Sequence, residues 1–204
     1  MTSSASSAAF SARENGDLNQ YWYSGVTIKA LTSAALEACV SGSTSSSSGD
    51  GSGPHRVAFL STPSLYFSLP AAARVGHSVL DIDTQWSKDP GFIRFDFNED
   101  PTVALPPAAL GAYDLVVIDP PFITEPVWRR YALAAHALLK GGAKGGVICT
   151  TVAENEGLLA ELFVGCKSVP FQPSIPNLVY QYNTFTNVDP VPSALAIKNK
   201  EIPE

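Results

Sequence analysis

The stretch "VVIDPPFITEP" (residues 116–126) places residues that can hold an amine directly after an apolar run. Its first three residues read as a strand buried on both faces, so Asp119 stands where that strand leaves the sheet, at the edge where open α/β sheets bind ligands. Pro120 and Pro121 hold the chain extended and donate no backbone hydrogen bond, and Phe122 adds an aromatic face. An amine that donated to both the carboxylate and a proline carbonyl would aim its lone pair away from them. The alternative interpretation is an ordinary proline-rich turn.

Three further acids follow strands of the same kind. Asp81 and Asp83 come after the second apolar run, and Asp96 ends the third. Together with Asp119 they would line one edge of a parallel sheet, where a ligand lying across the strands could be gripped. A carboxylate after the second strand suits a ribose diol, because it can accept both hydroxyl hydrogens. For Asp83 and Asp96 taken singly, the usual role of Asp in turns explains the residue equally well.

The elements that must position these residues alternate along the chain, which predicts a mostly parallel α/β sheet. Apolar runs predict strands at 57–60, 78–83, 92–97, 114–119 and 145–151. Helical spacing of apolar residues predicts helices over 24–40, over 154–163, and after Thr124, where the buried stripe is Val127, Tyr131, Ala134 and Leu138. The segments 166–171 and 178–187 predict an antiparallel pair of strands at the sheet edge.

Three segments lack the pattern of packed structure. Residues 1–17 are small and polar, which predicts a disordered tail. The segment 41–54 is rich in Ser and Gly, which predicts a flexible insertion within a catalytic domain over 18–190. Residues 191–204 are assigned to a C-terminal tail.

The composition excludes several classes of protein. A chain of 204 residues with a net charge of −6 is long enough for one α/β domain, and its 13 Lys and Arg form no cluster that predicts duplex binding. No apolar run approaches the roughly 18 residues of a membrane span, and no signal peptide is visible, so we expect a soluble cytoplasmic monomer. A transit peptide is the weaker alternative for the Ser- and Ala-rich start. The three cysteines and three histidines show no disulfide or metal spacing, so no metal is predicted.

The sequence also resembles a known family. "DPPF" matches the [DNS]PP[YFW] motif of amino-group methyltransferases that use S-adenosylmethionine. Further stretches resemble one branch, the translation elongation factor 1-alpha lysine methyltransferases, formerly described as N6-adenine DNA methyltransferases. These stretches are "QYWYS" (20–24), "STPSLYF" (61–67), "DID" (81–83), "FDFNEDP" (95–101), "YDLVVIDPPF" (113–122) and "PNLVYQYNTFTN" (176–187).

This resemblance implies a seven-stranded class I methyltransferase fold, Rossmann-like, with a C-terminal antiparallel hairpin and S-adenosyl-L-methionine as the cofactor. Carried over by position, it implies cofactor contacts from the turn after the first strand, a ribose contact and an adenine contact. The residues implied are Ser61, Pro63, Ser64 and Tyr66 for the turn, Asp83 for the ribose, and Asp96 with Phe97 for the adenine. Asp119, Pro120, Pro121 and Phe122 would form the amine-binding motif. Tyr21 and Trp22 would cover the site, and Asn177 matches a family position in the substrate pocket. The short segment after "STPSLYF" implies a truncated first crossover helix.

The DPPF motif serves a protein lysine and a nucleic-acid adenine equally well, so it leaves the acceptor open. The acidic net charge and the lack of length for a DNA-recognition domain favour a protein lysine, with nucleic acid as an unlikely partner. The resemblance implies that this lysine is on translation elongation factor 1-alpha. The alternatives are N6-adenine methylation of DNA or RNA, and a binding module that has lost catalysis.

Overall fold

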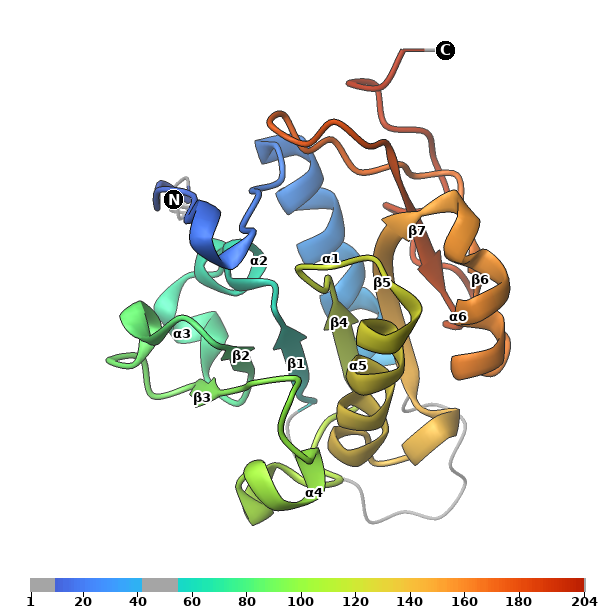
Figure 1. Ribbon diagram of the computed structural model, residues 1–204. Helices are drawn as coiled ribbons and strands as arrows, with labels where there is room; N and C mark the ends of the chain where they lie inside the picture. The colour runs from blue at the N-terminus through green and yellow to red at the C-terminus, as the bar shows by residue number, and fades with distance from the viewer. Residues whose placement is uncertain (1–9, 42–54, 204) are drawn as a thin grey trace, which may run out of the picture.

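A computed structural model describes residues 10–41 and 55–203 and shows one mixed sheet with helices on both faces (Figure 1). Within these residues the seven strands lie in the order β3-β2-β1-β4-β5-β7-β6. Their bounds are β1 Val57–Leu60, β2 Ser78–Asp81, β3 Phe92–Arg94, β4 Leu115–Ile118, β5 Gly146–Val152, β6 Lys167–Ser168 and β7 Tyr182–Thr186. Strands β1 to β5 are parallel, and β7 runs antiparallel to both β5 and β6. The predicted α/β sheet with antiparallel C-terminal strands is confirmed.

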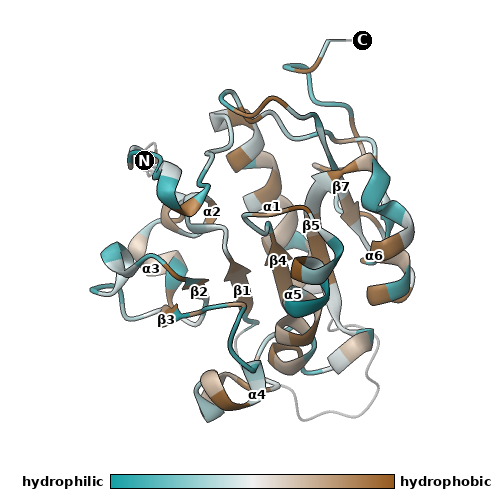
Figure 2. Ribbon diagram, viewed as in Figure 1, coloured by the Kyte–Doolittle hydropathy of each residue, from teal (hydrophilic) through white to brown (hydrophobic). Residues whose placement is uncertain are grey.

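Alternate residues of each strand pack against helices on opposite faces of the sheet. The helices are α1 Gly25–Ser41, α2 Pro63–Ser68, α3 Ala71–Arg74, α4 Pro101–Ala104, α5 Glu125–Leu138 and α6 Glu156–Leu162. Val57 and Phe59 pack with α1 and α2, while Ala58 and Leu60 pack with α5 and α6. Successive side chains of a strand point to opposite faces, so a strand covered on both faces must be apolar throughout. Figure 2 shows the central strands accordingly coloured as the hydrophobic part of the molecule.

Several predicted strands are shorter than expected at the edge that carries the acids. Strand β2 ends at Asp81 instead of residue 83, and β3 ends at Arg94 instead of residue 97. The chain turns there because Asp side chains accept backbone N–H groups of nearby residues, as Asp81 does from Asp83 and Asp96 from Asn98. The expected truncation of the first crossover is also found, because α2 and α3 have only six and four residues.

The terminal segments pack more closely than tails would. Within the expected tail over 1–17, residues 10–17 are ordered: Phe10 lies edge-on against Trp22 with ring centroids 5.1 Å apart, and Glu14 Oε1 accepts the Trp22 N–H at 2.8 Å. The sequence pattern hid this packing because a single aromatic residue stands among small ones. In the expected C-terminal tail, Leu195 is fully buried. The insertion predicted over 41–54 lies outside the described residues after position 41.

The three cysteines are buried and form no disulfide within the described residues. Cys39, Cys149 and Cys166 are free thiols within the buried core. Among residues 10–41 and 55–203, no helix is both long and apolar enough to cross a membrane.

Candidate active site

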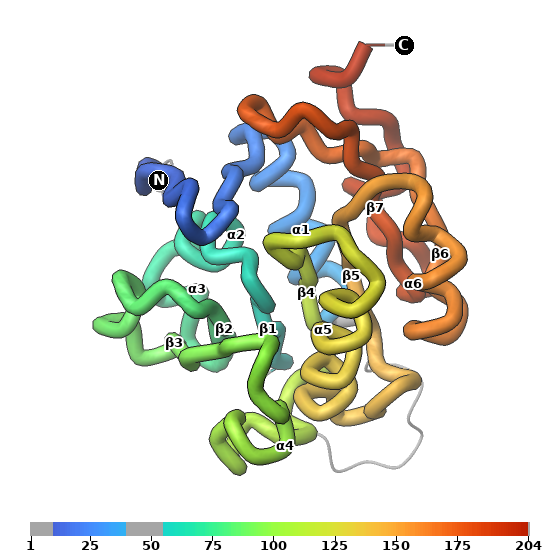
Figure 3. Tube along the Cα trace, viewed as in Figure 1, coloured from blue at the N-terminus to red at the C-terminus, as the bar shows by residue number. Residues whose placement is uncertain are grey.

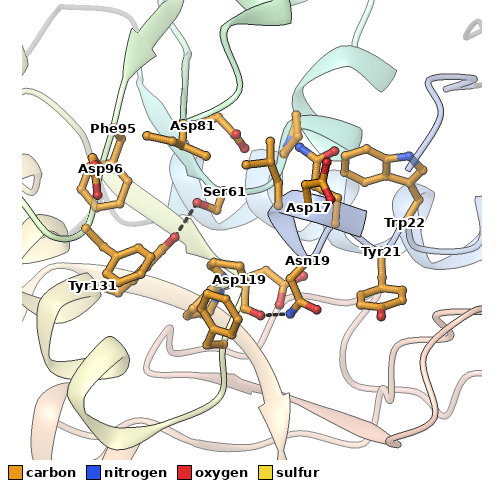
Figure 4. A pocket seen from close by; sticks show the side chains of 18 of the residues that line it. Asp17, Asn19, Tyr21, Trp22, Ser61, Asp81, Phe95, Asp96, Asp119 and Tyr131 are labelled. Carbon is orange, nitrogen blue, oxygen red and sulfur yellow. Dashed lines mark hydrogen bonds between the residues drawn. The ribbon is translucent and has the colours of Figure 1, made fainter. Parts of the chain in front are cut away.

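A cavity of about 320 Å³ lies at the carboxyl ends of β1 to β4. Side chains that follow these four strands form its floor, and the N-terminal segment over 17–22 covers it (Figure 4). The tube in Figure 3 shows this segment crossing the ends of the strands toward the loop that follows β4. The cavity therefore occupies the place where a parallel α/β sheet binds its ligands.

Most of the predicted site residues line this one cavity. They come from the turn after β1, from the segment after β3, from the DPPF motif and from the N-terminal cover: Ser61, Pro63, Asp96, Phe97, Asp119, Pro120, Pro121, Phe122, Tyr21 and Trp22. Their positions span about a hundred residues of sequence, so the fold brings together what the motifs only suggested.

Four predicted residues do not line the cavity. Ser64 is buried within α2, and the Tyr66 hydroxyl turns away to donate to Asp89 Oδ1 at 2.7 Å. Asp83 points toward the covering segment, where its carboxylate accepts from Gln20 Nε2 at 3.1 Å and from the Gln85 backbone N–H at 3.0 Å. Asn177 is exposed beside the cavity and donates to Glu14 Oε2 at 2.8 Å. Each of these side chains is engaged in a local hydrogen bond or in packing, not in lining the cavity.

The structure adds residues that the motifs did not single out for the site. Phe95 and Tyr131 join the side of the cavity next to β1 to β3, and Tyr182 joins it from β7. Asp81, expected at this edge of the sheet but given no role, also lines the cavity. The ribose role was expected for Asp83 because the strand was predicted to continue to residue 83, whereas β2 ends at Asp81. Tyr131 was predicted only as part of a buried helical stripe, because helical periodicity does not reveal that its hydroxyl reaches the cavity.

The side next to β1 to β3, called here the β1–β3 side, is built by short-range geometry. Ser61 adopts a left-handed backbone conformation with φ of 56°, which turns the chain sharply after β1. Its hydroxyl lies 2.7 Å from the Tyr131 hydroxyl. Asp81 is 5% exposed, and this burial raises the pKa of its carboxyl to about 6, while the backbone N–H of Asp83 stabilises the ionised form.

The opposite side, called the β4–β7 side, centres on Asp119. The Tyr23 hydroxyl donates to Asp119 Oδ2 at 2.5 Å and lies 2.6 Å from Thr150 Oγ1. Burial raises the pKa of the Asp119 carboxyl to about 7, and the hydroxyl groups of Tyr23 and Thr150 limit that rise. The site thus holds a carboxyl group that changes its charge near neutral pH.

The covering segment is tied to both sides. Asn19 Nδ2 donates to the carbonyl oxygen of Pro121 on the β4–β7 side. The next residue, Gln20, donates to Asp83 beside the β1–β3 side. Two adjacent side chains therefore tie the covering segment to both sides of the cavity, and Figure 4 shows the Asn19 bond.

The ionisable lining of the cavity is acidic. Four carboxyl groups, those of Asp17, Asp81, Asp96 and Asp119, line it, and none of its described lining residues is Lys, Arg or His. A cavity of this kind favours a cationic ligand and disfavours a phosphate. Among the residues the structure describes, a separate group of possible metal ligands (Cys39, His55 and Asp114) lies at the other edge of the sheet, but both Asp114 oxygens accept hydrogen bonds, from Lys140 Nζ and the Arg56 N–H.

Comparison with known proteins identifies relatives over most of the chain. A family profile described as "Probable N6-adenine methyltransferase" matches residues 14–190. The mouse (Mus musculus) protein "EEF1A lysine methyltransferase 1" is 31% identical over 181 residues, covering 86% of this chain and 76% of its own length. The human (Homo sapiens) protein of the same name is 29% identical over 181 residues, with the same coverage.

Structural likeness is weaker. A solved S-adenosyl-L-methionine methyl transferase from Silicibacter pomeroyi gives a TM-score of 0.40 at 17% identity, covering 79% of this chain and 94% of the other. The fold assignment rests instead on the strand order of the sheet, in which β7 alone is reversed. By the extent of the profile match and by its identity to these relatives, the chain belongs to the probable N6-adenine methyltransferase family.

Proposed function

We propose that this protein is an S-adenosylmethionine-dependent methyltransferase that modifies a lysine of translation elongation factor 1-alpha. The observation that carries the proposal is the acidic cavity whose floor places Asp119 beside Pro120 and Phe122. The names of the relatives support a protein-lysine acceptor, and the family supports a methyltransferase. The target lysine side chain is itself a cation, which an acidic cavity favours.

The residues of the β1–β3 side fit the cofactor that the family implies. When bound, S-adenosylmethionine supplies an electrophilic methyl group on a positively charged sulfur. A cavity of about 320 Å³ falls within the range of ligand pockets, and its carboxylates complement that charge. Asp81 at the end of β2 would hold the ribose hydroxyls, Asp96 and Phe97 would contact the adenine, and Ser61 and Pro63 would form the turn beneath the cofactor.

On the β4–β7 side, Asp119 and Pro120 bind the acceptor amine. The Asp119 carboxylate and the Pro120 carbonyl each accept one amine hydrogen, which leaves the nitrogen lone pair directed away from both. The Pro121 carbonyl already accepts a hydrogen bond from Asn19, so the Pro120 carbonyl is the one proposed to bind the amine. Phe122 and Tyr182 line the cavity beside Asp119 and exclude water around the amine.

A lysine must lose its proton before it can accept a methyl group. Its reference pKa of about 10.4 means that this costs roughly 4.6 kcal/mol at pH 7. Burial among the aromatic side chains of Tyr21, Phe122 and Tyr182 disfavours the ammonium form and lowers that cost. The Asp119 carboxylate opposes this by attracting the ammonium, so the desolvation by the aromatic side chains must outweigh that attraction.

A surface for a protein substrate adjoins the cavity. Phe122 is 50% exposed, and Val179 and Tyr180 are exposed directly after Leu178, which lines the cavity. Exposed apolar side chains at the mouth of an acidic cavity suit a polypeptide that presents a lysine. They suit a phosphate backbone less well, although the family description favours adenine as the alternative acceptor.

The compartment and assembly belong to the same proposal. The three cysteines are buried and free, which suits the reducing cytoplasm where the elongation factor works. The assembly proposed is a monomer.

The test is a competition among acceptors. The purified enzyme is given labelled S-adenosylmethionine with elongation factor 1-alpha, single-stranded DNA, RNA or duplex DNA in parallel, and an Asp119→Asn variant serves as the control. Label on a lysine of the protein, located by mass spectrometry and lost in the variant, is the expected result. Label on adenine would show that the acceptor is a nucleic acid. Cofactor binding without transfer to the protein, DNA or RNA would indicate a binding module.

A further inference from the structure

The Tyr23 hydroxyl lies between two groups of the β4–β7 side. It is 2.5 Å from Asp119 Oδ2 and 2.6 Å from Thr150 Oγ1. Tyr23 is 5% exposed and Thr150 is 1% exposed, and neither lines the cavity. They form a buried chain of hydroxyl groups behind the carboxyl group that does face it.

Backbone contacts fix Tyr23 in this place. It stands two residues before α1, and the next residue, Ser24, donates its backbone N–H to the carbonyl of Ser174 at 2.8 Å. Thr27, in the first turn of α1, accepts the Ser174 N–H through its hydroxyl at 2.9 Å. Thr150 lies in the middle of β5, paired with Thr184 of β7. The hydroxyl chain is therefore supported by a helix start and by two strands.

The donors and acceptors allow one direction of hydrogen bonding when Asp119 is ionised. A carboxylate can only accept, so the single hydroxyl hydrogen of Tyr23 goes to Asp119 Oδ2. Thr150 must then donate its own hydrogen to Tyr23. This engages Oδ2 and restrains rotation of the carboxylate, so we assign Oδ1 to the amine.

We propose that Tyr23, supported by Thr150, is a positioning residue that orients Asp119 toward the acceptor amine. The proposal rests on the proposed function, because it assigns Tyr23 a role in amine binding without contact to the amine. A loose carboxylate would bind the amine in several orientations, and misplacement by about 1 Å costs roughly 10²-fold in rate.

The proposal also predicts a pH signature, because the Tyr23 hydroxyl favours the ionised form of Asp119. The other titratable groups near Asp119 are Tyr131, Tyr182 and Cys149, and burial raises the pKa of each above its ordinary value. None of these groups changes charge between pH 6 and pH 9. Asp81, with a pKa of about 6, does, but it lies on the β1–β3 side and changes equally in the wild type and in a Tyr23 variant.

The first experiment measures kcat and KM of Tyr23→Phe between pH 6 and pH 9. Loss of the hydroxyl raises the pKa of Asp119 in the free enzyme, so the ratio of variant to wild-type kcat/KM, which reports the free enzyme, rises about tenfold across this range. The matched control is Tyr113→Phe, which removes another buried hydroxyl, one that donates to Ser78 Oγ at 2.8 Å outside the cavity. A ratio for Tyr23→Phe that stays constant with pH, as expected for the control, would overturn the proposal.

Two further measurements keep the test independent of folding and of the acceptor. Thr150→Val should lower kcat/KM by a smaller factor than Tyr23→Phe, about threefold at pH 6.5, and Thr150→Ser should restore it because the donor returns. Carboxyl carbon NMR of the enzyme without substrate, with the Asp119 resonance assigned by Asp119→Asn, should show a higher titration midpoint in Tyr23→Phe. An unchanged midpoint refutes the role of Tyr23, whichever acceptor the enzyme uses. The proposed function fails separately, if the wild-type enzyme transfers no methyl group to the elongation factor.

Discussion

The two sides of the cavity are built in different ways. On the β1–β3 side, most contributing residues stand at or just after the strand that positions them, as Ser61 and Asp81 do, with Tyr131 of α5 as an exception. On the β4–β7 side, Asp119 depends on partners far away in the chain: Tyr23 is 96 residues distant. The first side is therefore determined by where strands end, and the second by how α1 and β5 pack around one carboxyl group.

The two buried acids show the consequence of this difference. Burial raises the pKa of both Asp81 and Asp119, but backbone N–H groups stabilise ionised Asp81, whereas hydroxyl groups stabilise ionised Asp119. A backbone donor cannot be removed by substitution of its side chain, and a hydroxyl can. We therefore expect substitutions to separate cofactor binding on one side from turnover on the other.

The largest expected effect comes from Asp119→Asn. The amide keeps the shape and one acceptor but loses the charge that holds the amine, so kcat should fall by about 10²- to 10³-fold, as for loss of a preorganised polar group. Affinity for S-adenosylmethionine, measured by calorimetry, should change by less than about threefold, because the cofactor contacts are on the β1–β3 side. A variant with near-normal turnover would remove Asp119 from the amine site.

A smaller effect distinguishes the two acids after β2. Asp81→Asn should weaken S-adenosylmethionine binding by roughly 10- to 100-fold, the loss of a charged hydrogen bond. Asp83→Ala should weaken it by only a few-fold, because Asp83 contacts the covering segment and does not line the cavity. Calorimetry on both variants checks this order. The reverse order would restore Asp83 as the ribose acid, as the family resemblance implied.

The stability of the protein without cofactor should depend on Asp119 in the opposite sense to activity. A carboxyl whose pKa is raised to about 7 by folding stabilises the native state below its unfolded pKa of about 3.9, and this contribution is lost as the pH rises through 7. Asp119→Asn has no carboxyl to ionise, so its free energy of unfolding does not decrease in this pH range for that reason. We expect a higher Tm than wild type at pH 8 by a few degrees and little difference at pH 4. Equal values of Tm at pH 8 would show that ionised Asp119 is not destabilising.

Sequence patterns could predict the sheet and most of the cavity lining, because apolar runs fix strands and parallel strands end at one edge. The pattern over 114–119 predicted β4 and the place of Asp119 correctly. It could not place Tyr23, because "QYWYS" lies before the first helix and nothing in the spacing says which of its rings turns inward. In the structure Tyr23 is buried, while Tyr21 lies at the cavity.

The early end of β2 and the packing of Phe10 have a common origin. The alternating residues of "SVLDID" continue the strand pattern to residue 83, but a hydrogen bond from the Asp83 N–H to the Asp81 carboxylate turns the chain first. Likewise, Phe10 packs against Trp22 although its neighbours carry small side chains. In both cases a single specific contact overrides a pattern averaged over several residues.

The smallest expected effects test the covering segment, where Asn19 and Gln20 bridge the two sides. Asn19 donates to the Pro121 carbonyl and Gln20 to the Asp83 carboxylate, so each side chain ties the segment to a different side. Gln20→Ala should raise the KM for S-adenosylmethionine by about two- to fivefold with little change in kcat, since one partly exposed hydrogen bond is lost. Asn19→Ala should instead lower kcat by a similar factor, because the proline motif loses a contact that holds it in place.

Steady-state kinetics on the two single variants and the double variant check this. Independent effects that multiply would mean that the segment acts locally on each side, whereas a double variant no worse than either single one would show that the two residues close the cavity as one unit.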